Sequence, residues 1–155
     1  MKKYSDKRHR IMSTNPRYEE NWTPLFAPLV FFLPCFYSYG IRIDDDELLF
    51  GYGFRKPWGF TSKKVDLKDL DSIVTGTASW KDNLSKFGGW GIRYDLFHNI
   101  GNNGDSDSQS SGWAYNASNG PYVDISLKDG SAFRFASRDA ARVEAVLIEG
   151  SSKSN

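Results

Sequence analysis

The C-terminal part of this chain has the pattern of two paired β-strands, and this pattern constrains the fold more than any other feature. In residues 122–127 a valine, an isoleucine and a leucine occupy every second position, so they share one face of an extended strand. Asp129-Gly130 follows as a two-residue turn, and Phe133 and Phe135 then resume the apolar face. The pattern predicts a β-hairpin with one buried face.

The period of the apolar residues changes after this hairpin from that of a strand to that of a helix. Ser137 is the predicted N-cap, and Asp139 lies in the positive first turn. Gly150 is the predicted end of the helix. One helical face carries Ala140, Val143, Val146 and Leu147.

The middle of the chain contains several short segments that are typical of strands. Residues 39–43 and 47–54 flank an acidic turn, Asp44-Asp45-Asp46, and predict another hairpin. Further strand-like segments lie at 64–67, around Leu70 and Ile73, at 90–94 and at 112–116.

About seven strands followed by one helix predict a mainly β fold. A small barrel of antiparallel strands has an open end, and a C-terminal helix with an apolar stripe can close it. The predicted domain covers residues 38–150 and is followed by a polar tail, residues 151–155.

The first 37 residues divide into two parts. Residues 1–21 are polar and basic without apolar periodicity, which predicts a flexible basic arm. Residues 22–37 are uncharged and largely apolar, and Pro24, Pro28 and Pro34 interrupt them. This second part is a candidate for membrane contact.

Four roles remain open for the apolar segment. It can lie on a membrane surface or pack on the folded domain. It can also span a membrane, although its apolar centre, residues 25–36, would reach only about 18 Å as a helix against a hydrocarbon core of about 30 Å. A cleaved secretory signal fits the basic start, but Glu19 and Glu20 intervene and no A-x-A-like site follows.

Composition narrows the classes of function. The chain has 155 residues with a single cysteine, Cys35, which excludes an internal disulfide and a zinc site built from cysteines. The net charge of +1 excludes an electrostatic case for nucleic-acid binding by the whole chain. The two histidines, His9 and His98, do not have the spacing of a metal-ligand pair, and no sequence motif assembles a catalytic set of serine, histidine and acid. We expect no cofactor, no metal and no nucleic-acid partner.

Three motifs occur in a characteristic order: FGGWGIR at 87–93, GWAYNAS at 112–118, and DG at 129–130 before a phenylalanine-rich strand. The series resembles a group of uncharacterised bacterial proteins with a pleckstrin-homology-like domain, and the match covers about residues 40–148. The resemblance implies a pleckstrin-homology-like barrel close to a membrane, and it implies no catalytic residues. Members usually carry two membrane helices before the barrel, whereas this chain has one proline-broken segment and a long insert at 95–111.

Two sets of residues are candidates for binding. Trp113 and Tyr115 lie two positions apart and therefore share a strand face, which forms either an aromatic platform for a peptide or lipid headgroup or a part of the core. Arg93 can contact a phosphate or pair with a carboxylate such as Asp124.

The second set lies in and after the loop 54–60, where basic and aromatic residues mix as they do at membrane interfaces. A solvated, well-packed loop is the alternative. The residues are Arg55, Lys56 and Trp58, with Lys63 and Lys64 close behind.

Other potential sites are less well supported. The acidic turn at 44–46 would repel a phosphoinositide headgroup. The D-x-D pattern of the insert at 101–109 lacks the closing bidentate acid of a calcium loop.

Together, these observations predict a non-catalytic binding or scaffolding module near a membrane surface. Its expected partner is an anionic membrane lipid or a membrane protein, and its expected location is cytoplasmic, peripheral to or anchored in the inner membrane. The alternative is a soluble barrel that binds a protein or peptide partner through an exposed sheet edge. A small-molecule enzyme is a third class and would need a deep polar pocket with His98 or convergent carboxylates.

Overall fold

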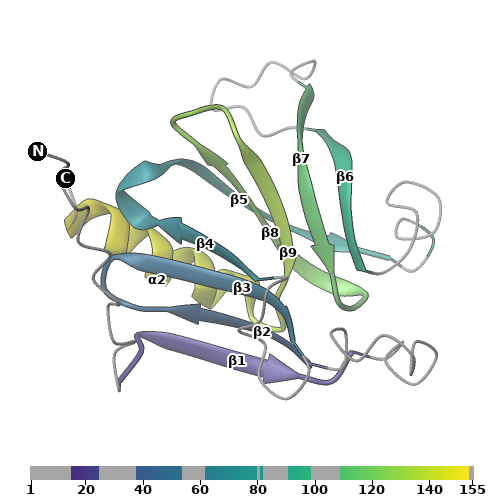
Figure 1. Cartoon of the computed structure of the whole chain (residues 1–155), viewed down its shortest axis with the longest axis horizontal. Helices are drawn as coiled ribbons and strands as arrows, with labels where there is room; N and C mark the ends of the chain where they lie inside the picture. Colours follow the sequence, from purple (N-terminus) through teal and green to yellow (C-terminus); the bar gives the residue numbers. More distant parts are fainter. Residues whose placement is uncertain are drawn as a thin grey trace, which may run out of the picture.

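Most strands form in segments that the sequence pattern predicts, and they assemble into two sheets rather than one closed barrel. The computed structural model describes residues 15–24, 38–53, 62–79, 81, 91–98 and 109–153. Within these residues nine strands form two sheets, and one helix follows them (Figure 1).

Sheet A is the four-stranded layer, with the order β1-β2-β3-β4 and antiparallel pairing throughout. The acidic turn joins β2 to β3 as predicted, with a backbone hydrogen bond from Asp44 N–H to Glu47 O. The bounds are β1 Tyr18–Trp22, β2 Ser38–Ile43, β3 Glu47–Gly53 and β4 Lys63–Asp66.

Sheet B is the five-stranded layer, with the order β5-β8-β9-β7-β6. The 3-10 helix η3 (Leu67–Asp69) carries the chain from sheet A into this layer. The last strand, β9, inserts between β8 and β7 and pairs with β7 in parallel. The bounds are β5 Leu70–Ala78, β6 Gly91–His98, β7 Gln109–Asn116, β8 Gly120–Leu127 and β9 Ala132–Ala136.

The core lies between the sheets and is mostly aromatic. The Phe50 ring of β3 stacks on Phe135 of β9, with ring centroids 4.6 Å apart. Two buried phenols also cross from sheet A to sheet B: Tyr39 OH donates to Ala136 O at 3.1 Å, and Tyr52 OH donates to Asn116 O at 2.5 Å. Burial removes these hydroxyls from water, so the two bonds help to set how the layers lie on one another.

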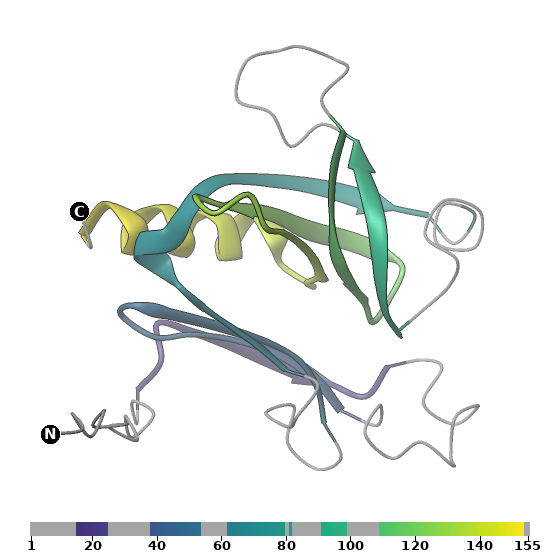
Figure 2. The same ribbon diagram turned by 45° about the horizontal axis from the view of Figure 1, so that its top comes forward.

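The helix α2 (Ala140–Lys153) bridges the two layers along one side (Figure 2). It packs on β5 and β8, and its Val143 and Leu147 side chains are fully buried in the core. On the sheet A side, Glu149 forms an ion pair with Arg17 at 2.7 Å, and Ser137 Oγ, just before the helix, donates to Glu20 at 2.7 Å. A mainly β fold that ends in a packed C-terminal helix is therefore confirmed.

The prediction of about seven antiparallel strands is wrong in number and in one pairing, because nine strands are described and β7 and β9 run parallel. These strands form two sheets rather than a closed barrel. Residues 18–22, assigned from sequence to the flexible arm and the start of the apolar segment, form β1 instead. Tyr18 and Trp22 point into the core, and this burial holds the strand in sheet A.

Details at both ends of the helix also differ from the predictions. The N-cap is Asp139 rather than Ser137, since Asp139 Oδ1 accepts a hydrogen bond from Arg142 N–H at 3.2 Å. Ser137 Oγ instead accepts a hydrogen bond from Asp139 N–H, before the helix begins. Gly150 does not end the helix, which continues to Lys153. A Cβ at Gly150 would lie 2.5 Å from Leu67 Cδ1, so this glycine allows the helix to approach η3.

The turn between β8 and β9 is one residue longer than predicted. Leu127 N–H donates to Ser131 O, so the loop has three residues, 128–130. Gly130 adopts φ of +85°, the left-handed conformation that ends such loops, and Gly130 N–H donates to Leu127 O.

The bond between Tyr52 and Asn116 can be tested by substitution. We expect Tyr52→Phe to lower the free energy of unfolding by about 1–2 kcal/mol, because the buried Asn116 carbonyl loses this donor. Urea denaturation followed by circular dichroism measures the change. Tyr115→Phe is the matched control, since its ring packs in the same core and the described residues show no hydrogen bond from its hydroxyl. Equal losses in the two variants would contradict this role of the bond.

The buried phenols also predict a loss of stability in alkali. Burial raises the pKa of Tyr39 well above 10.0 and, with the charge of Glu20, raises the pKa of Tyr18 to about 12. In the unfolded chain these groups ionise near pH 10, so the folded state loses stability as the pH rises from there toward the folded pKa values. Unfolding measured at pH 8 to 12 should show a decline that begins near pH 10. A constant free energy of unfolding over this range would argue against the raised pKa values.

Candidate functional site

An aromatic and basic surface lies where the open side of sheet B meets the edge strand of sheet A. We call it the aromatic rim and define it as Lys63 of β4, Trp113 of β7 and Phe133 of β9, which is itself buried. Lys63 Nζ lies 4.8 Å from the centre of the Phe133 ring, within the range of a cation–π contact. Phe133 is the register partner of Trp113, and the Trp113 residue is 47% exposed.

The positive charge of Lys63 at the rim has an acidic residue, Asp129, in its vicinity. The Asp129 carboxylate in the β8–β9 loop accepts a hydrogen bond from Ser131 N–H at 2.9 Å. The pKa of Asp129 is lowered mainly by hydrogen bonds from Ser131, with a smaller effect from the positive charge of Lys63. The Lys63 ammonium therefore has an anionic neighbour on one side and an aromatic ring below it.

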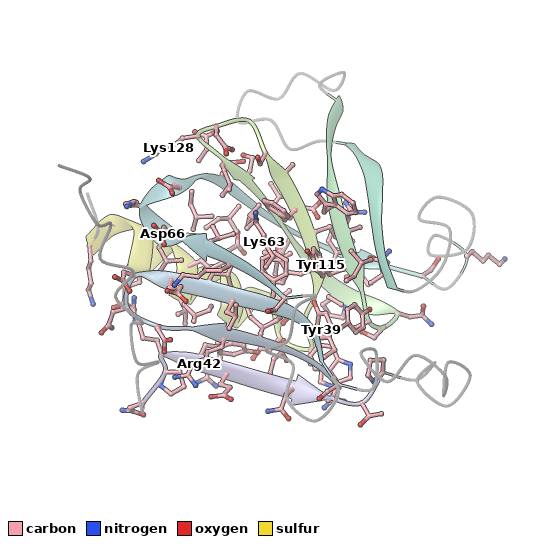
Figure 3. All side chains as sticks on the ribbon, viewed as in Figure 1. Tyr39, Arg42, Lys63, Asp66, Tyr115 and Lys128 are labelled. Carbon is pink, nitrogen blue, oxygen red and sulfur yellow. The ribbon has the colours of Figure 1, made fainter. Side chains whose placement is uncertain are left out.

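Tyr115 shares a strand face with Trp113, as predicted, but it belongs to the core. It is 8% exposed, and its ring meets Phe50 edge-on with centroids 5.0 Å apart. Figure 3 labels Tyr115 on β7 and Lys63 on β4. Lys63 is the register partner of Phe50 on β3. Sheet A covers the end of β7 that carries Tyr115 and leaves Trp113 half-exposed, so the core alternative is confirmed for Tyr115.

Lys64 is not part of the rim. Consecutive residues of a strand point to opposite faces, and Lys64 instead forms an ion pair with Glu47 of β3. Arg55, Lys56 and Trp58 lie outside the described residues, so the structure does not place them.

Arg93 is described as a backbone position only. It lies in β6 opposite Ala114 of β7. The carboxylate suggested from sequence as its partner, Asp124, is held by Arg134: Nε donates to Oδ1 at 2.6 Å and Nη2 donates to Oδ2 at 2.5 Å. Both side chains of this pair are less than 5% exposed.

This buried pair was not predicted from the sequence, although a signal for it exists. Asp124 stands between two apolar residues of β8, and Arg134 stands between two phenylalanines of β9. The Arg134 guanidinium also lies 4.0 Å from the centre of the Tyr122 ring. Burial raises the pKa of Asp124, and the hydrogen bonds from Arg134 oppose this increase. The pair is a structural feature of sheet B, since almost none of it reaches solvent.

A shallow depression of about 380 Å³ lies beside the start of α2, between β5 and β8. Its only carboxylate, Asp139, caps the helix, and the Arg138 guanidinium lies 4.9 Å from the centre of the Trp22 ring. Among the described residues that line the depression there is no second acid, so they provide no pair of convergent carboxylates. Its lining residues are Thr75, Gly76, Thr77, Pro121, Arg138, Asp139, Ala140 and Ala141.

The residues that the structure describes contain no cluster of three or more histidine, cysteine, aspartate or glutamate side chains that could hold a metal ion. They also contain no helix that is both long and apolar enough to cross a bilayer. Residues 99–108 of the insert at 95–111 and most of the apolar segment, residues 25–37, lie outside these residues.

Comparisons with protein-family models, with curated proteins and with solved structures find no match to this chain.

The role of the Arg134–Asp124 pair can be measured. We expect Asp124→Leu to lower the free energy of unfolding by about 3–5 kcal/mol, because a buried guanidinium loses its carboxylate. The double variant Asp124→Leu/Arg134→Met removes both charges and should recover most of this loss, as urea denaturation would show. A double variant as unstable as the single one would mean that an unpaired charge is not the cause.

Proposed function

We propose that this chain is a non-catalytic binding module that acts at an anionic membrane surface. The observation that carries the proposal is the aromatic rim, where a half-exposed Trp113 lies on the same open face as the Lys63 ammonium. Tryptophan favours the interface between headgroups and acyl chains, and a nearby cation is attracted to anionic lipid. Shallow insertion of Trp113 with Lys63 against a headgroup uses both properties.

The N-terminal region supports the same proposal through its charge. Residues 1–10 contain five basic side chains and one acidic side chain. The acidic residues that follow are engaged within the fold, since Glu19 meets Arg42 at 3.4 Å and Glu20 accepts from Ser137. Each basic residue close to an anionic surface contributes about 1 kcal/mol. Residues 1–37 would therefore steer the domain toward anionic lipid.

The proposal includes a relationship to the bacterial group with pleckstrin-homology-like domains, and with it a cytoplasmic location at the inner membrane. A mainly β domain that ends in one packed helix supports this relationship. The parallel β7–β9 pair is a departure from a simple antiparallel barrel.

Vesicle binding tests the proposed function. The full chain should sediment with vesicles that contain phosphatidylglycerol and much less with phosphatidylcholine alone, and added salt should weaken binding. We expect Trp113→Ala and Lys63→Gln each to weaken binding several-fold, because each removes one part of the rim.

Lys64→Gln is the matched control for Lys63→Gln. It removes the same charge from the adjacent residue, whose side chain is 55% exposed and faces away from the rim. Equal effects at Lys63 and Lys64 would show a general charge effect and refute the rim as the contact. A chain that binds neither type of vesicle would refute the membrane function itself.

A second candidate function is the binding of a protein partner by strand addition. The observation in its favour is β6, an eight-residue strand that pairs with β7 and with no other described strand. An open strand edge offers backbone donors and acceptors to an added strand.

A further inference from the structure

Four strand edges exist in the two described sheets, and they differ in how they are protected. The edge β1 meets α2 at Tyr18, whose ring centre lies 5.7 Å from the Arg142 guanidinium, and at the Arg17–Glu149 ion pair just before the strand; the edge β5 is packed against the helix. The edge β4 has only four residues and carries Lys63, Lys64 and Asp66, and short charged edges resist pairing. The edge β6 is twice as long and lies at the outer side of sheet B (Figure 1).

We infer that β6 pairs with β6 of a second copy of this chain, in an antiparallel arrangement centred on Tyr94. The inference rests on the second candidate function, strand addition, because both use the edge of β6. It specifies the partner as a second copy of the chain. The sequence of β6 is GIRYDLFH. Pairing about Tyr94 places Arg93 opposite Asp95 of the second copy, and the two-fold symmetry repeats this pair.

Charge complementarity selects this register over its neighbours. A register centred on Arg93 would oppose two arginines, and one centred on Asp95 would oppose two aspartates; directly opposed like charges destabilise a sheet. Only the Tyr94-centred register places each charge opposite one of the other sign. It also places Ile92 opposite Leu96 of the second copy, which adds an apolar cross-strand pair on the other face.

The position of β6 in the fold supports the same partner. Ile92 and Tyr94 lie opposite Tyr115 and Trp113 of β7, and Ile92 is packed against the core. A second copy would therefore continue the face of sheet B that carries Trp113. The symmetry that relates the two copies makes the contact isologous and closes the assembly as a dimer.

Pairing through β6 would also determine where the two aromatic rims of the dimer lie. The two-fold axis between antiparallel strands runs perpendicular to the sheet, so both Trp113 side chains would lie on the same face of a joined sheet. Two rims on one face can engage one surface together, which strengthens attachment without new contacts.

Sedimentation equilibrium of the full chain, over a series of concentrations, tests the inference. We expect a monomer–dimer equilibrium, with the dissociation constant raised about tenfold or more by Arg93→Asp or by Asp95→Arg, because each creates like-charge pairs. The double variant Arg93→Asp/Asp95→Arg restores opposite charges and should restore dimerisation. Lys153→Glu reverses an exposed charge at the end of α2 and is the control that should change nothing.

A second measurement applies to the unmodified chain and does not depend on any variant folding. Backbone hydrogen exchange in β6 should become slower as the concentration rises, since pairing protects the outward amides. Exchange in β6 that is independent of concentration, a chain that is monomeric throughout, or a dimer that the single reversals leave intact would each overturn the inference. Vesicle binding by the monomer would survive that result, so the two proposals fail separately.

Discussion

Two buried phenol hydroxyls must find acceptors inside the core, and the arrangement of the two sheets depends on this requirement. Tyr39 and Tyr52 are register partners in sheet A, and their rings meet edge-on with centroids 4.9 Å apart. Each donates to a carbonyl of sheet B, on β9 and β7 respectively. A buried hydroxyl without a partner is costly, so the layers cannot slide without losing both bonds. The aromatic packing around Phe50 then fills the space that these bonds define.

The same arrangement explains why the rim is open. Sheet A reaches the end of β7 where Asn116 accepts the bond from Tyr52, and it covers Tyr115 next to it. Trp113 lies two residues farther along β7 and is left half-exposed. Lys63 lies at this boundary because it belongs to β4, the edge strand of sheet A, where it is the register partner of Phe50. The candidate site is therefore a product of unequal coverage between two layers, and no local motif encodes it.

Two of the wrong sequence predictions have identifiable physical causes. A two-residue turn at Asp129-Gly130 would have placed Asp124 opposite Phe135, whereas the three-residue loop places it opposite Arg134. A turn that is one residue longer shifts the pairing of β8 with β9 by one residue. The predicted turn therefore did not place Asp124 opposite Arg134, and the buried ion pair was missed. The prediction that Gly150 ends the helix is wrong for a different reason, because the role of this glycine is set by the approach of Leu67 from another part of the chain.

The sequence by itself determined the elements whose information is local. Period-two alternation specified the β2–β3 and β8–β9 hairpins, and the three-to-four spacing specified α2 with its buried Val143 and Leu147. Only the tertiary structure decided the parallel insertion of β9 beside β7, the recruitment of β1 into sheet A, and the separation of Trp113 from Tyr115. These three features depend on contacts between segments that are far apart in the chain. The periodicity of one segment does not indicate which other segment will pack on it.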